Sequence, residues 1–586
     1  MTKNILFFLS FLLGTGALSA QQRDERVRDY LPPVRIVWMQ DSSAIRGAEN
    51  LLSPGKGQAE LSSRGLCRMK AGPGARPSVL LDFGREIHGG IRLVTGMPAD
   101  QRPIAVRVRL GESVSEAMSE PDGQNGAGND HAMRDFRMQL PWLGVAEAGN
   151  SGFRFVRIDL EDPERELILR EVSACSVYRD LPQPGAFACD DKRLNDIWAT
   201  GAYTVHLNMQ NYLWDGIKRD RLVWVGDLHP EVMTVSSVFG PDPIVPASLD
   251  LARDITPLPG WMNGIGSYSL WWIIIQRDWY RYYGDRAYLQ EQRGYLGALA
   301  EQIIATLDKN GREHTGATRF LDWPSSENTA AIDAGLQALT VMALEAADEL
   351  CRTTGEDSLA LRCRQAHDKA LKEARRMAKN FFREHDGSQK GDKQAAALLT
   401  LCGAVDPHRA AEVLTAGGAA HFSTFYGYYM LEALALAGCE ERAMELLKTY
   451  WGGMLDLGAT TFWEDFDLAW TENAARIDSL VPEGKKDIHG DFGAYCYKGF
   501  RHSLCHGWAS GPTAWLSRHV LGIRPTDDRH YVIRPRLGHL QWAEGTFPTA
   551  LGVIKVRHDK GPDGRINTSV KAPQGIEITV EKPSTL

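Results

Sequence analysis

The apolar residues of the chain change their spacing twice, which divides the sequence into three regions. From about residue 35 to residue 178 they form short or alternating runs separated by Gly and Pro, a pattern typical of strands. The clearest runs are 79–83, 91–94, 106–110, 153–158 and 167–169. Many short strands within one region of this size indicate a β-sandwich.

Beyond Pro182 the apolar residues recur at intervals of three or four, as amphipathic helices require. One such series is Leu336, Leu339, Ala343, Ala347 and Leu350. The pattern continues to about residue 525, and an all-helical region of that length favours a helical toroid over a small bundle. Runs typical of strands return at 531–533, 552–556 and 576–580. We therefore expect an N-terminal β-sandwich at 21–182, a helical domain at 183–525 and a C-terminal β-domain at 526–586.

The first 20 residues predict a cleavable export signal. Lys3 supplies a positive charge, residues 5–13 are apolar, and the small residues at 17–20 end in Ala20, after which we expect cleavage. The first cysteine is Cys67, so a lipid anchor close to this signal is not expected. No later apolar run approaches the roughly 20 residues of a membrane span. The sequence therefore predicts a secreted or periplasmic protein without a membrane span.

The composition of the chain limits the classes of ligand that we expect it to bind. The chain has 66 Lys and Arg against 74 Asp and Glu, a formal net charge of −8, so we expect no nucleic-acid partner. Its nine cysteines are scattered without the spacing of a metal site, and no loop of closely spaced carboxylates suggests calcium. We expect neither a metal nor another cofactor. The 16 Trp and 17 Tyr include flat rings that suit the faces of sugars, although most aromatic residues pack in cores.

The segment 215–227 is the most informative one in the chain. If its second half is helical, Asp220, Trp224 and Asp227 project from one face, and an aromatic ring flanked by carboxylates suits a sugar better than it suits a core. The alternative is a helix cap in which the carboxylates pair with Arg219 and Arg221.

A second segment, 458–467, places Glu464 beside Trp463 after a turn that contains Gly and Thr. Cleavage of a glycosidic bond needs two carboxyl groups, one that donates a proton to the leaving oxygen and one that acts as base or nucleophile. Asp220 and Glu464 are the candidates for this catalytic pair, and Trp463 is a candidate for binding substrate.

These segments resemble glycoside hydrolase family 78, the bacterial α-L-rhamnosidases. The run 215–227, Asp-Gly-Ile-Lys-Arg-Asp-Arg-Leu-Val-Trp-Val-Gly-Asp, is similar to the acidic signature of that family. Residues 458–464 resemble its Gly-Ala-Thr-Thr-x-Trp-Glu element, residues 503–512 its closing His-Gly-Trp element, and residues 82–89 its N-terminal sandwich motif. Four elements in the right order are a far more specific signal than any one alone.

The resemblance implies a fold of α and β domains in which a central (α/α)6 barrel lies between N-terminal and C-terminal β-sandwiches. It also implies an inverting mechanism, with Asp220 as general acid and Glu464 as general base. By the same resemblance Asp215, Arg219, Trp224 and Asp227 hold the sugar. The chain departs from the family at Gly216 and Ile217, where Cys-Pro is usual, and at Asp220, where Glu is usual.

Three further residues resemble the family's sugar-binding positions. His506 is similar to a histidine that contacts the sugar, and Asp322 with Trp323 is similar to an Asp-Trp pair that lines the pocket. Each has a structural alternative, because His506 could be a hydrogen-bonded core residue and Asp322 could cap the helix that follows.

Three functions remain open from the sequence. The leading hypothesis is an exo-acting hydrolase that removes terminal α-L-rhamnose, or a similar deoxy sugar, from oligosaccharides or polysaccharides. A polysaccharide lyase on the same type of barrel would need a Tyr or His base and a group that neutralises a uronate, which the acidic cluster does not favour. A non-catalytic glycan-binding protein of a polysaccharide uptake system would keep the aromatic pocket and lack a competent acid.

Overall fold

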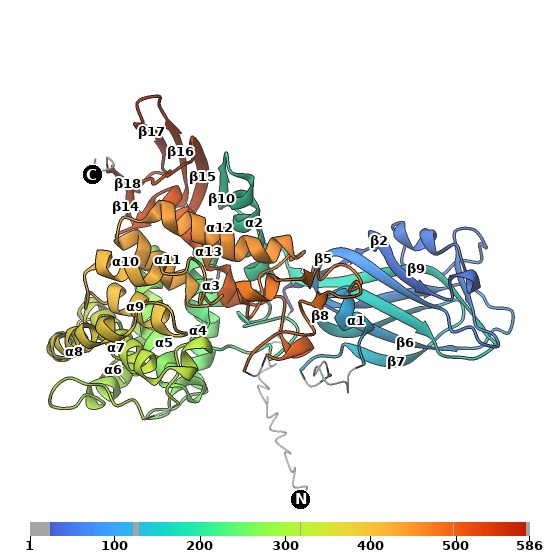
Figure 1. Cartoon of the computed structure of the whole chain (residues 1–586), viewed down its shortest axis with the longest axis horizontal. Helices are drawn as coiled ribbons and strands as arrows, with labels where there is room; N and C mark the ends of the chain where they lie inside the picture. Colours follow the sequence, from blue (N-terminus) through green and yellow to red (C-terminus); the bar gives the residue numbers. More distant parts are fainter. Residues whose placement is uncertain (1–23, 121–127, 130, 317, 496, 582–586) are drawn as a thin grey trace, which may run out of the picture.

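The structure is a computed structural model of the chain and describes residues 24–120, 128–129, 131–316, 318–495 and 497–581. The predicted export signal at 1–20 lies outside the described residues. Three parts are visible in Figure 1: a large N-terminal sheet on the right, a helical region on the left, and a smaller C-terminal sheet above the helices.

The N-terminal part is one antiparallel sheet of nine strands. The strands are β1 (Arg26–Leu31), β2 (Arg35–Gln40), β3 (Ile45–Arg46), β4 (Cys67–Lys70), β5 (Ser78–Thr95), β6 (Ile104–Gly111), β7 (Asp135–Leu140), β8 (Val145–Leu160) and β9 (Glu166–Arg179). Their main order is β3-β4-β9-β5-β8-β6-β7, and β1 and β2 add to β9 and β5. All five runs predicted as strands lie in this sheet.

The long strand β5 connects the two halves of the sheet. Its first residues, 78–82, pair with β2 and β8, and its last residues pair with β8 and β9, with register shifts between the two halves. Ile104, Val106 and Val108 of β6 alternate with less buried residues, so one face of that strand packs inward. The buried apolar residues of this part form a hydrophobic core of their own.

The middle of the chain contains twelve α-helices among the described residues. They are α2 (Lys192–Asn208), α3 (Leu228–Val238), α4 (Ile244–Asp254), α5 (Gly266–Tyr283), α6 (Arg286–Ala305), α7 (Thr329–Thr353), α8 (Asp357–Glu384), α9 (Asp392–Leu401), α10 (Pro407–Thr415), α11 (Gly427–Leu436), α12 (Glu440–Asp456) and α13 (Gly511–Trp515). The predicted helical series that starts at Leu336 lies in α7.

Six of these helices form a closed ring. Helices α3, α5, α7, α9, α11 and α13 each pack on the next, and α13 packs back on α3. Every residue of α3 is buried, as expected for a helix with neighbours on all sides. The outer helix α8 instead buries one stripe at spacings of three and four, seen at Leu359, Cys363, Ala366 and Ala370. The burial of α3 and α8 thus differs as their places in the ring and outside it require.

The C-terminal sheets share the core of the helices. Strands β10 (Ala186–Cys189), β15 (Trp542–Thr549), β16 (Gly552–Lys560) and β17 (Ile566–Lys571) form one sheet, and β13 (Ile523–Pro525), β14 (His530–Ile533) and β18 (Glu577–Val580) form another. Strand β10 comes directly before α2, within the range 183–525 predicted as helical, yet it pairs with β15. Phe547, Ile554 and Val556 belong to the same hydrophobic cluster as the helices.

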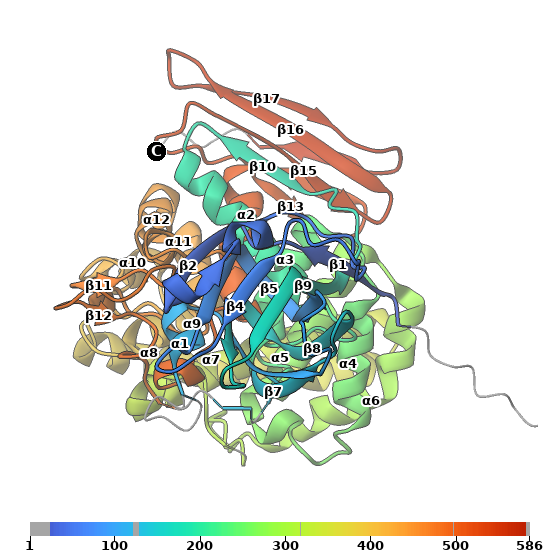
Figure 2. The same cartoon turned by 90° about the vertical axis from the view of Figure 1, so that its right-hand side faces the viewer.

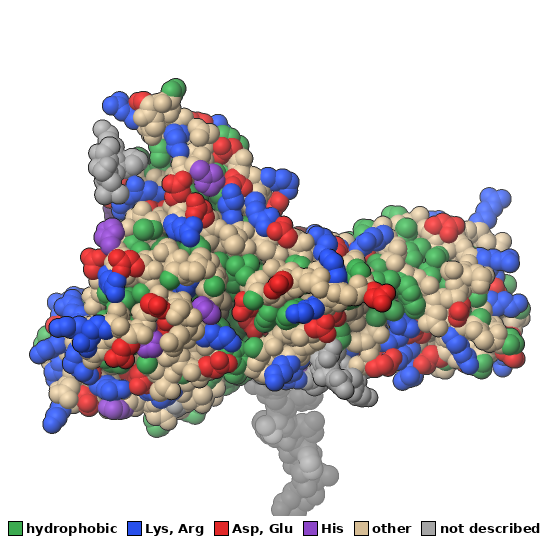
Figure 3. All heavy atoms as spheres, viewed as in Figure 1, with side chains coloured by type: hydrophobic (Ala, Val, Ile, Leu, Met, Phe, Trp, Pro, Cys, Tyr) green, Lys and Arg blue, Asp and Glu red, His purple; other side chains and the backbone are tan. Residues whose placement is uncertain are grey.

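The three parts meet closely. In Figure 2 the N-terminal strands lie in front of the helical region, and β15, β16 and β17 lie above both. One described helix, α7, is long and apolar enough to span a membrane by length and composition, but 72% of its most apolar stretch is buried inside the fold, as in the core helix of a globular domain. On the face drawn in Figure 3, basic and acidic side chains are interspersed.

Candidate active site

The acidic segment 215–227 is a loop between α2 and α3, so the helical interpretation of its second half is wrong. Asp220 and Arg221 both have left-handed backbone conformations, with φ of 56° and 58°, which a helix excludes. The side chain of Asp215 closes the loop, because its Oδ1 accepts a hydrogen bond from the backbone N–H of Leu222 at 2.9 Å. Left-handed conformations at two consecutive residues other than Gly are costly, and such backbone strain tends to gather at functional sites.

The loop nevertheless brings together the side chains that a helix was expected to align. Trp224 Nε1 donates to Asp220 Oδ2 at 3.2 Å, and Arg219 Nη1 donates to Asp220 Oδ1 at 2.9 Å. His131, from the N-terminal part, has its Nδ1 at 3.4 Å from the same Asp220 oxygen. Asp220 is therefore held by an indole and a guanidinium at the boundary between the sheet and the helices.

Glu464 follows α12 on the loop that the second segment predicted. Glu464 is 2% exposed, and three groups surround its carboxylate. Arg219 Nη2 donates to Oε1, the backbone N–H of Ser503 donates to Oε2 at 3.0 Å, and His506 Nε2 lies 3.5 Å from Oε1. Burial raises the pKa of Glu464, and Arg219 acts in the opposite direction.

Arg219 is the link between the two candidate catalytic carboxylates. It donates to Asp220 through one terminal nitrogen and to Glu464 through the other, and its guanidinium lies over the ring of Tyr497 at 4.9 Å. Burial alone would lower the pKa of Arg219, but Glu464 and Asp220 raise it. The structure thus brings the predicted pair together around one fixed positive charge.

Asp215 and His506 are buried next to each other beside Arg219. Residues 216 and 506 form a β-bridge, the N–H of Gly507 donates to the backbone oxygen of Asp215 at 2.8 Å, and His506 Nε2 is 3.7 Å from Asp215 Oδ2. Burial, with Asp220 and Asp227 nearby, raises the pKa of Asp215 well above its ordinary value. Burial and the charge of Arg219 lower the pKa of His506 well below 6.5, so its imidazole is neutral.

Asp227 stands directly before α3, where it accepts a hydrogen bond from the hydroxyl of Tyr268 at 2.8 Å. Burial raises the pKa of Asp227 well above its ordinary value. Glu231, one turn further along α3, is fully buried, and neither of its carboxylate oxygens has a hydrogen-bond partner among the described residues. The start of α3 therefore adds two buried acids to the loop.

Asp322 and Trp323 occupy different environments. Asp322 is enclosed by protein donors: Ser423 Oγ at 2.7 Å, Gln394 Nε2 at 3.1 Å and the N–H of Ser325 at 3.1 Å. This last bond reaches the short 3-10 helix at Pro324–Glu327, whose N-cap residue is Trp323 and not Asp322. Trp323 is connected to the site, because its Nε1 donates at 2.6 Å to the hydroxyl of Tyr497, the residue whose ring lies against Arg219.

Trp463 is a core residue in this structure. It is 1% exposed and packs edge-on against Phe466 and His502, with ring centroids at 5.6 and 6.4 Å. The adjacent Glu464 points toward Arg219 instead. The structure gathers Asp220, Trp224 and Glu464 around Arg219, whereas Trp463 packs among core residues and Asp322 is enclosed by donors of its own.

Sequence reasoning missed several residues of this site. Tyr497 and Tyr268 support Arg219 and Asp227, Ser503 binds Glu464 through its backbone, and Glu231 adds a buried acid. Tyr497 lies in an aromatic stretch and Glu231 on an apolar helix, which were the only signals. A single sequence does not show which distant residue each of these side chains contacts.

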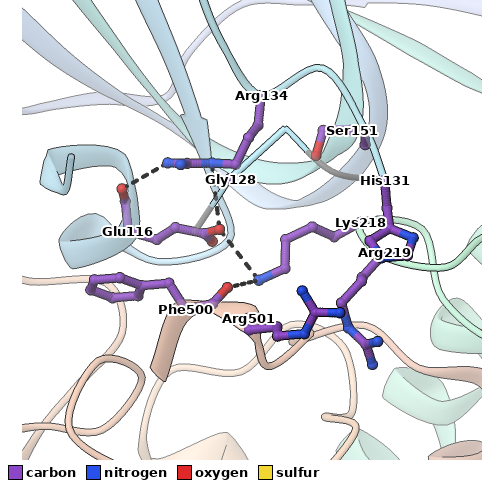
Figure 4. A pocket seen from close by; sticks show the side chains of 10 residues that line it. Glu116, Gly128, His131, Arg134, Ser151, Lys218, Arg219, Phe500 and Arg501 are labelled. Atoms are coloured by element: carbon purple, nitrogen blue, oxygen red, sulfur yellow. Dashed lines mark hydrogen bonds and ion pairs between the residues drawn. The ribbon is translucent and has the colours of Figure 1, made fainter. Parts of the chain in front are cut away.

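A small hollow adjoins Arg219 where the N-terminal part meets the helices. Figure 4 shows His131 and Arg134 from the N-terminal part facing Lys218, Arg219 and Arg501 from the helical part. Next to it, ligand atoms of Glu112, Glu116 and His489 lie within 4.8 Å of one another, the spacing of a possible metal site. The ammonium of Lys218 supplies positive charge there, at 3.0 Å from Glu112 Oε2 and 3.3 Å from Glu116 Oε1.

A pair of carboxylates is typical of the active site of a glycoside hydrolase. Here the pair lies beside aromatic rings and on loops of the helical part. Residues 182–520 match the bacterial α-L-rhamnosidase six-hairpin glycosidase domain, and residues 522–585 match the bacterial α-L-rhamnosidase C-terminal domain. The first match covers more than half of the chain. The chain belongs to the bacterial α-L-rhamnosidases of glycoside hydrolase family 78.

Relatives and solved structures agree with this assignment. An α-L-rhamnosidase of Streptomyces avermitilis is 25% identical over an alignment of 570 residues that covers 90% of this chain and 51% of that protein. A family 78 rhamnosidase of Bacillus sp. GL1 has a similar fold, with a TM-score of 0.72 and 22% identity over 92% of this chain and 56% of that one. A Klebsiella oxytoca rhamnosidase with rhamnose bound has a TM-score of 0.66 and 22% identity over 85% of this chain and 96% of that one. This chain spans about half the length of the first two relatives.

Proposed function

We propose that this protein is an exported, exo-acting glycoside hydrolase that removes terminal α-L-rhamnose, or a similar deoxy sugar, from oligosaccharides or polysaccharides. The observation that carries the proposal is the pairing of Asp220 and Glu464 on the guanidinium of Arg219. The closed ring of α3, α5, α7, α9, α11 and α13 supports an (α/α)6 barrel as the frame of this site, between the N-terminal sheet and the C-terminal sheets.

In the proposed mechanism Asp220 protonates the leaving glycosidic oxygen while Glu464 removes a proton from the attacking water. Inversion requires room for that water between the two carboxyl groups, which in inverting enzymes are about 6.5–9.5 Å apart. The raised pKa of Glu464 makes it a stronger base than an exposed glutamate, and the Ser503 N–H holds its second oxygen in place. Each oxygen of Asp220 accepts one hydrogen bond from Arg219 or Trp224, which leaves a second lone pair on each oxygen for the proton that the acid transfers.

The remaining residues would position the sugar. Asp215, Asp227 and His506 are buried polar groups beside the pair, and a neutral His506 can both donate and accept hydrogen bonds from sugar hydroxyls. Trp224 offers an indole face next to Asp220. Their combination suits a polar ring with one apolar face, such as a 6-deoxy sugar.

The test is release of rhamnose from p-nitrophenyl α-L-rhamnoside and from rhamnose-capped oligosaccharides. We expect release by the unmodified protein, near-complete loss in Asp220→Asn and Glu464→Gln, and unchanged release in the exposed control Glu472→Gln. NMR of the first product should show the β-anomer, as inversion demands. Sugar binding without release on any substrate would instead identify a glycan-binding protein, and an unsaturated product would identify a lyase.

A further inference from the structure

A buried cluster connects the N-terminal sheet to the loop that carries Arg219. Glu112 follows β6 and Glu116 lies in the short helix α1 (Val114–Met118), and both side chains are fully buried. The ammonium of Lys218 reaches both of them, and it also donates to the backbone oxygens of Phe500 at 2.8 Å and His502 at 2.5 Å. Figure 4 shows Lys218 between Glu116 on one side and Phe500 on the other.

Lys218 remains charged in this setting. Burial would lower the pKa of the ammonium, but Glu112 and Glu116 raise it above its ordinary value. A buried charge is tolerated only when it is paired and hydrogen-bonded, and removing one partner leaves the other uncompensated. The cluster therefore holds Lys218, and with it the backbone of the next residue, Arg219, in one position.

Glu112 has a second connection that leads to the other catalytic carboxylate. Its Oε1 accepts a hydrogen bond from the hydroxyl of Ser503 at 3.1 Å, and its Oε2 accepts one from the N–H of Leu504 at 2.6 Å. The backbone N–H of Ser503 in turn donates to Glu464 Oε2 at 3.0 Å. One carboxylate of the N-terminal part thus holds the segment that orients Glu464.

The two connections meet at the catalytic pair. Lys218 connects the cluster to the neighbouring Arg219, which binds both Asp220 and Glu464. Ser503 connects Glu112 to Glu464 by one hydrogen bond to each. We propose that Glu112 is a positioning residue, so that the N-terminal sheet is a working part of the active site. This inference rests on the proposed function, because it assigns a role in the reaction of that same pair.

A role in positioning differs measurably from a role in holding two parts together. Misplacement of a reacting group by about 1 Å costs about a hundredfold in rate, whereas loss of an interdomain contact alone lowers stability without changing the rate of the folded enzyme. Glu112→Gln keeps the shape of the side chain and removes its charge. Ser503→Ala removes one hydrogen bond to Glu112 and leaves the Lys218 pair intact, which makes it the milder variant if Glu112→Gln does not fold.

Glu171 provides a matched control inside the same sheet. It is also a buried glutamate paired with an arginine, and its partners, Arg92, Ser173 and the N–H of Gly57, all belong to the N-terminal part. Glu171→Gln therefore disturbs the sheet to a similar degree without a connection to the catalytic pair.

The experiment measures kcat and KM on an α-L-rhamnoside, together with hydrogen–deuterium exchange of peptides that cover 215–222 and 499–508. We expect kcat to fall about a hundredfold in Glu112→Gln and by a smaller factor in Ser503→Ala, with KM changed less than kcat and faster exchange in both peptides. Glu171→Gln should change neither kcat nor this exchange. An unchanged kcat in folded Glu112→Gln, or an equal loss in Glu171→Gln, overturns the inference.

The exchange measurement separates this inference from the proposed function. If the unmodified protein releases no rhamnose, the proposed function fails, and exchange alone then decides whether Glu112 positions the two segments. Faster exchange confined to Glu112→Gln and Ser503→Ala supports the positioning, and unchanged exchange in both variants rejects it.

Discussion

Arg219 and Glu464, which are 245 positions apart in the chain, form a buried ion pair in which Arg219 Nη2 donates to Glu464 Oε1. The other terminal nitrogen of Arg219 binds Asp220. A guanidinium is planar, so its two donors point in fixed directions and set the relative placement of the two carboxylates. The geometry of the proposed catalytic pair therefore depends on a residue that performs no proton transfer.

Replacing this guanidinium by an ammonium should separate the two carboxylates. Lysine is a single point charge and cannot hold two carboxylates in a fixed geometry. In Arg219→Lys we expect kcat/KM on an α-L-rhamnoside to fall about a hundredfold or more. The control is Arg221→Lys, because Arg221 lies in the same loop but bonds to Asn150 and lies over Trp214. Equal activities of the two variants would show that bridging by Arg219 has no role.

The pH dependence of the reaction should report Glu464 and not His506. Glu464 must be ionised to act as a base, and its pKa is raised above 4.5 by burial. We therefore expect kcat/KM to fall, as the solution is acidified, at a pH above the ordinary range of a glutamate. His506 is already neutral at these pH values, because its pKa lies well below 6.5. A His506→Gln variant that keeps measurable activity should retain the same acid limb, and disappearance of the limb would assign it to the imidazole.

Glu231 should make the fold less stable as the pH rises. Burial raises the pKa of Glu231 well above 4.5 in the folded protein, so the folded state favours the protonated acid. Its contribution to stability is present below the unfolded pKa and is lost as pH rises through the folded pKa. Melting curves between pH 5 and pH 8 should therefore show a smaller decline of Tm with pH in Glu231→Gln than in the unmodified protein.

The contribution of Glu171 to stability changes with pH in the opposite direction, so Glu171 serves as the control for Glu231. Its pKa is lowered in the folded protein, since its hydrogen bonds to Ser173, Arg92 and Gly57 together outweigh its desolvation, so the stability that it contributes is present at neutral pH and is lost on acidification. Glu171→Gln should accordingly lower Tm at pH 7. A Glu231→Gln variant with an unchanged Tm profile and abolished rhamnose release would instead place Glu231 among the residues that act on substrate.

Gly507 should not tolerate a larger residue. A Cβ at this position would overlap the carboxylate of Glu231, and the N–H of Gly507 bonds to the backbone of Asp215. We expect Gly507→Ala to lower the free energy of unfolding by about 1–3 kcal/mol, the usual cost of overpacking, and to lower activity by moving His506. Denaturant titration measures the first effect. The double variant Gly507→Ala/Glu231→Ala should recover stability, and failure to recover would mean that the contact with Glu231 is not the cause.

The sequence by itself determined the class of each region and most of the candidate residues. Alternation along β6 and three- and four-residue spacing along α7 depend on which side of a strand or helix faces the core, and this local periodicity is present in the residue order. The acidic, Gly-Thr and His-Gly-Trp segments indicated Asp220, Glu464 and His506 as candidates. In the structure Arg219 binds the first two, and His506 lies beside Glu464.

Only the tertiary structure decided how those residues meet. A helical second half of 215–227 would align Asp220, Trp224 and Asp227. The loop instead turns with left-handed backbone at Asp220 and Arg221, and Glu112 and Glu116 of the N-terminal part hold its Lys218, which no local pattern predicts. The same holds for the support of Arg219 by Tyr497 and for the pairing of β10 with a strand near the other end of the chain. Periodicity is a property of neighbouring residues, whereas these contacts join residues hundreds of positions apart and exist only after the helices and sheets have packed together.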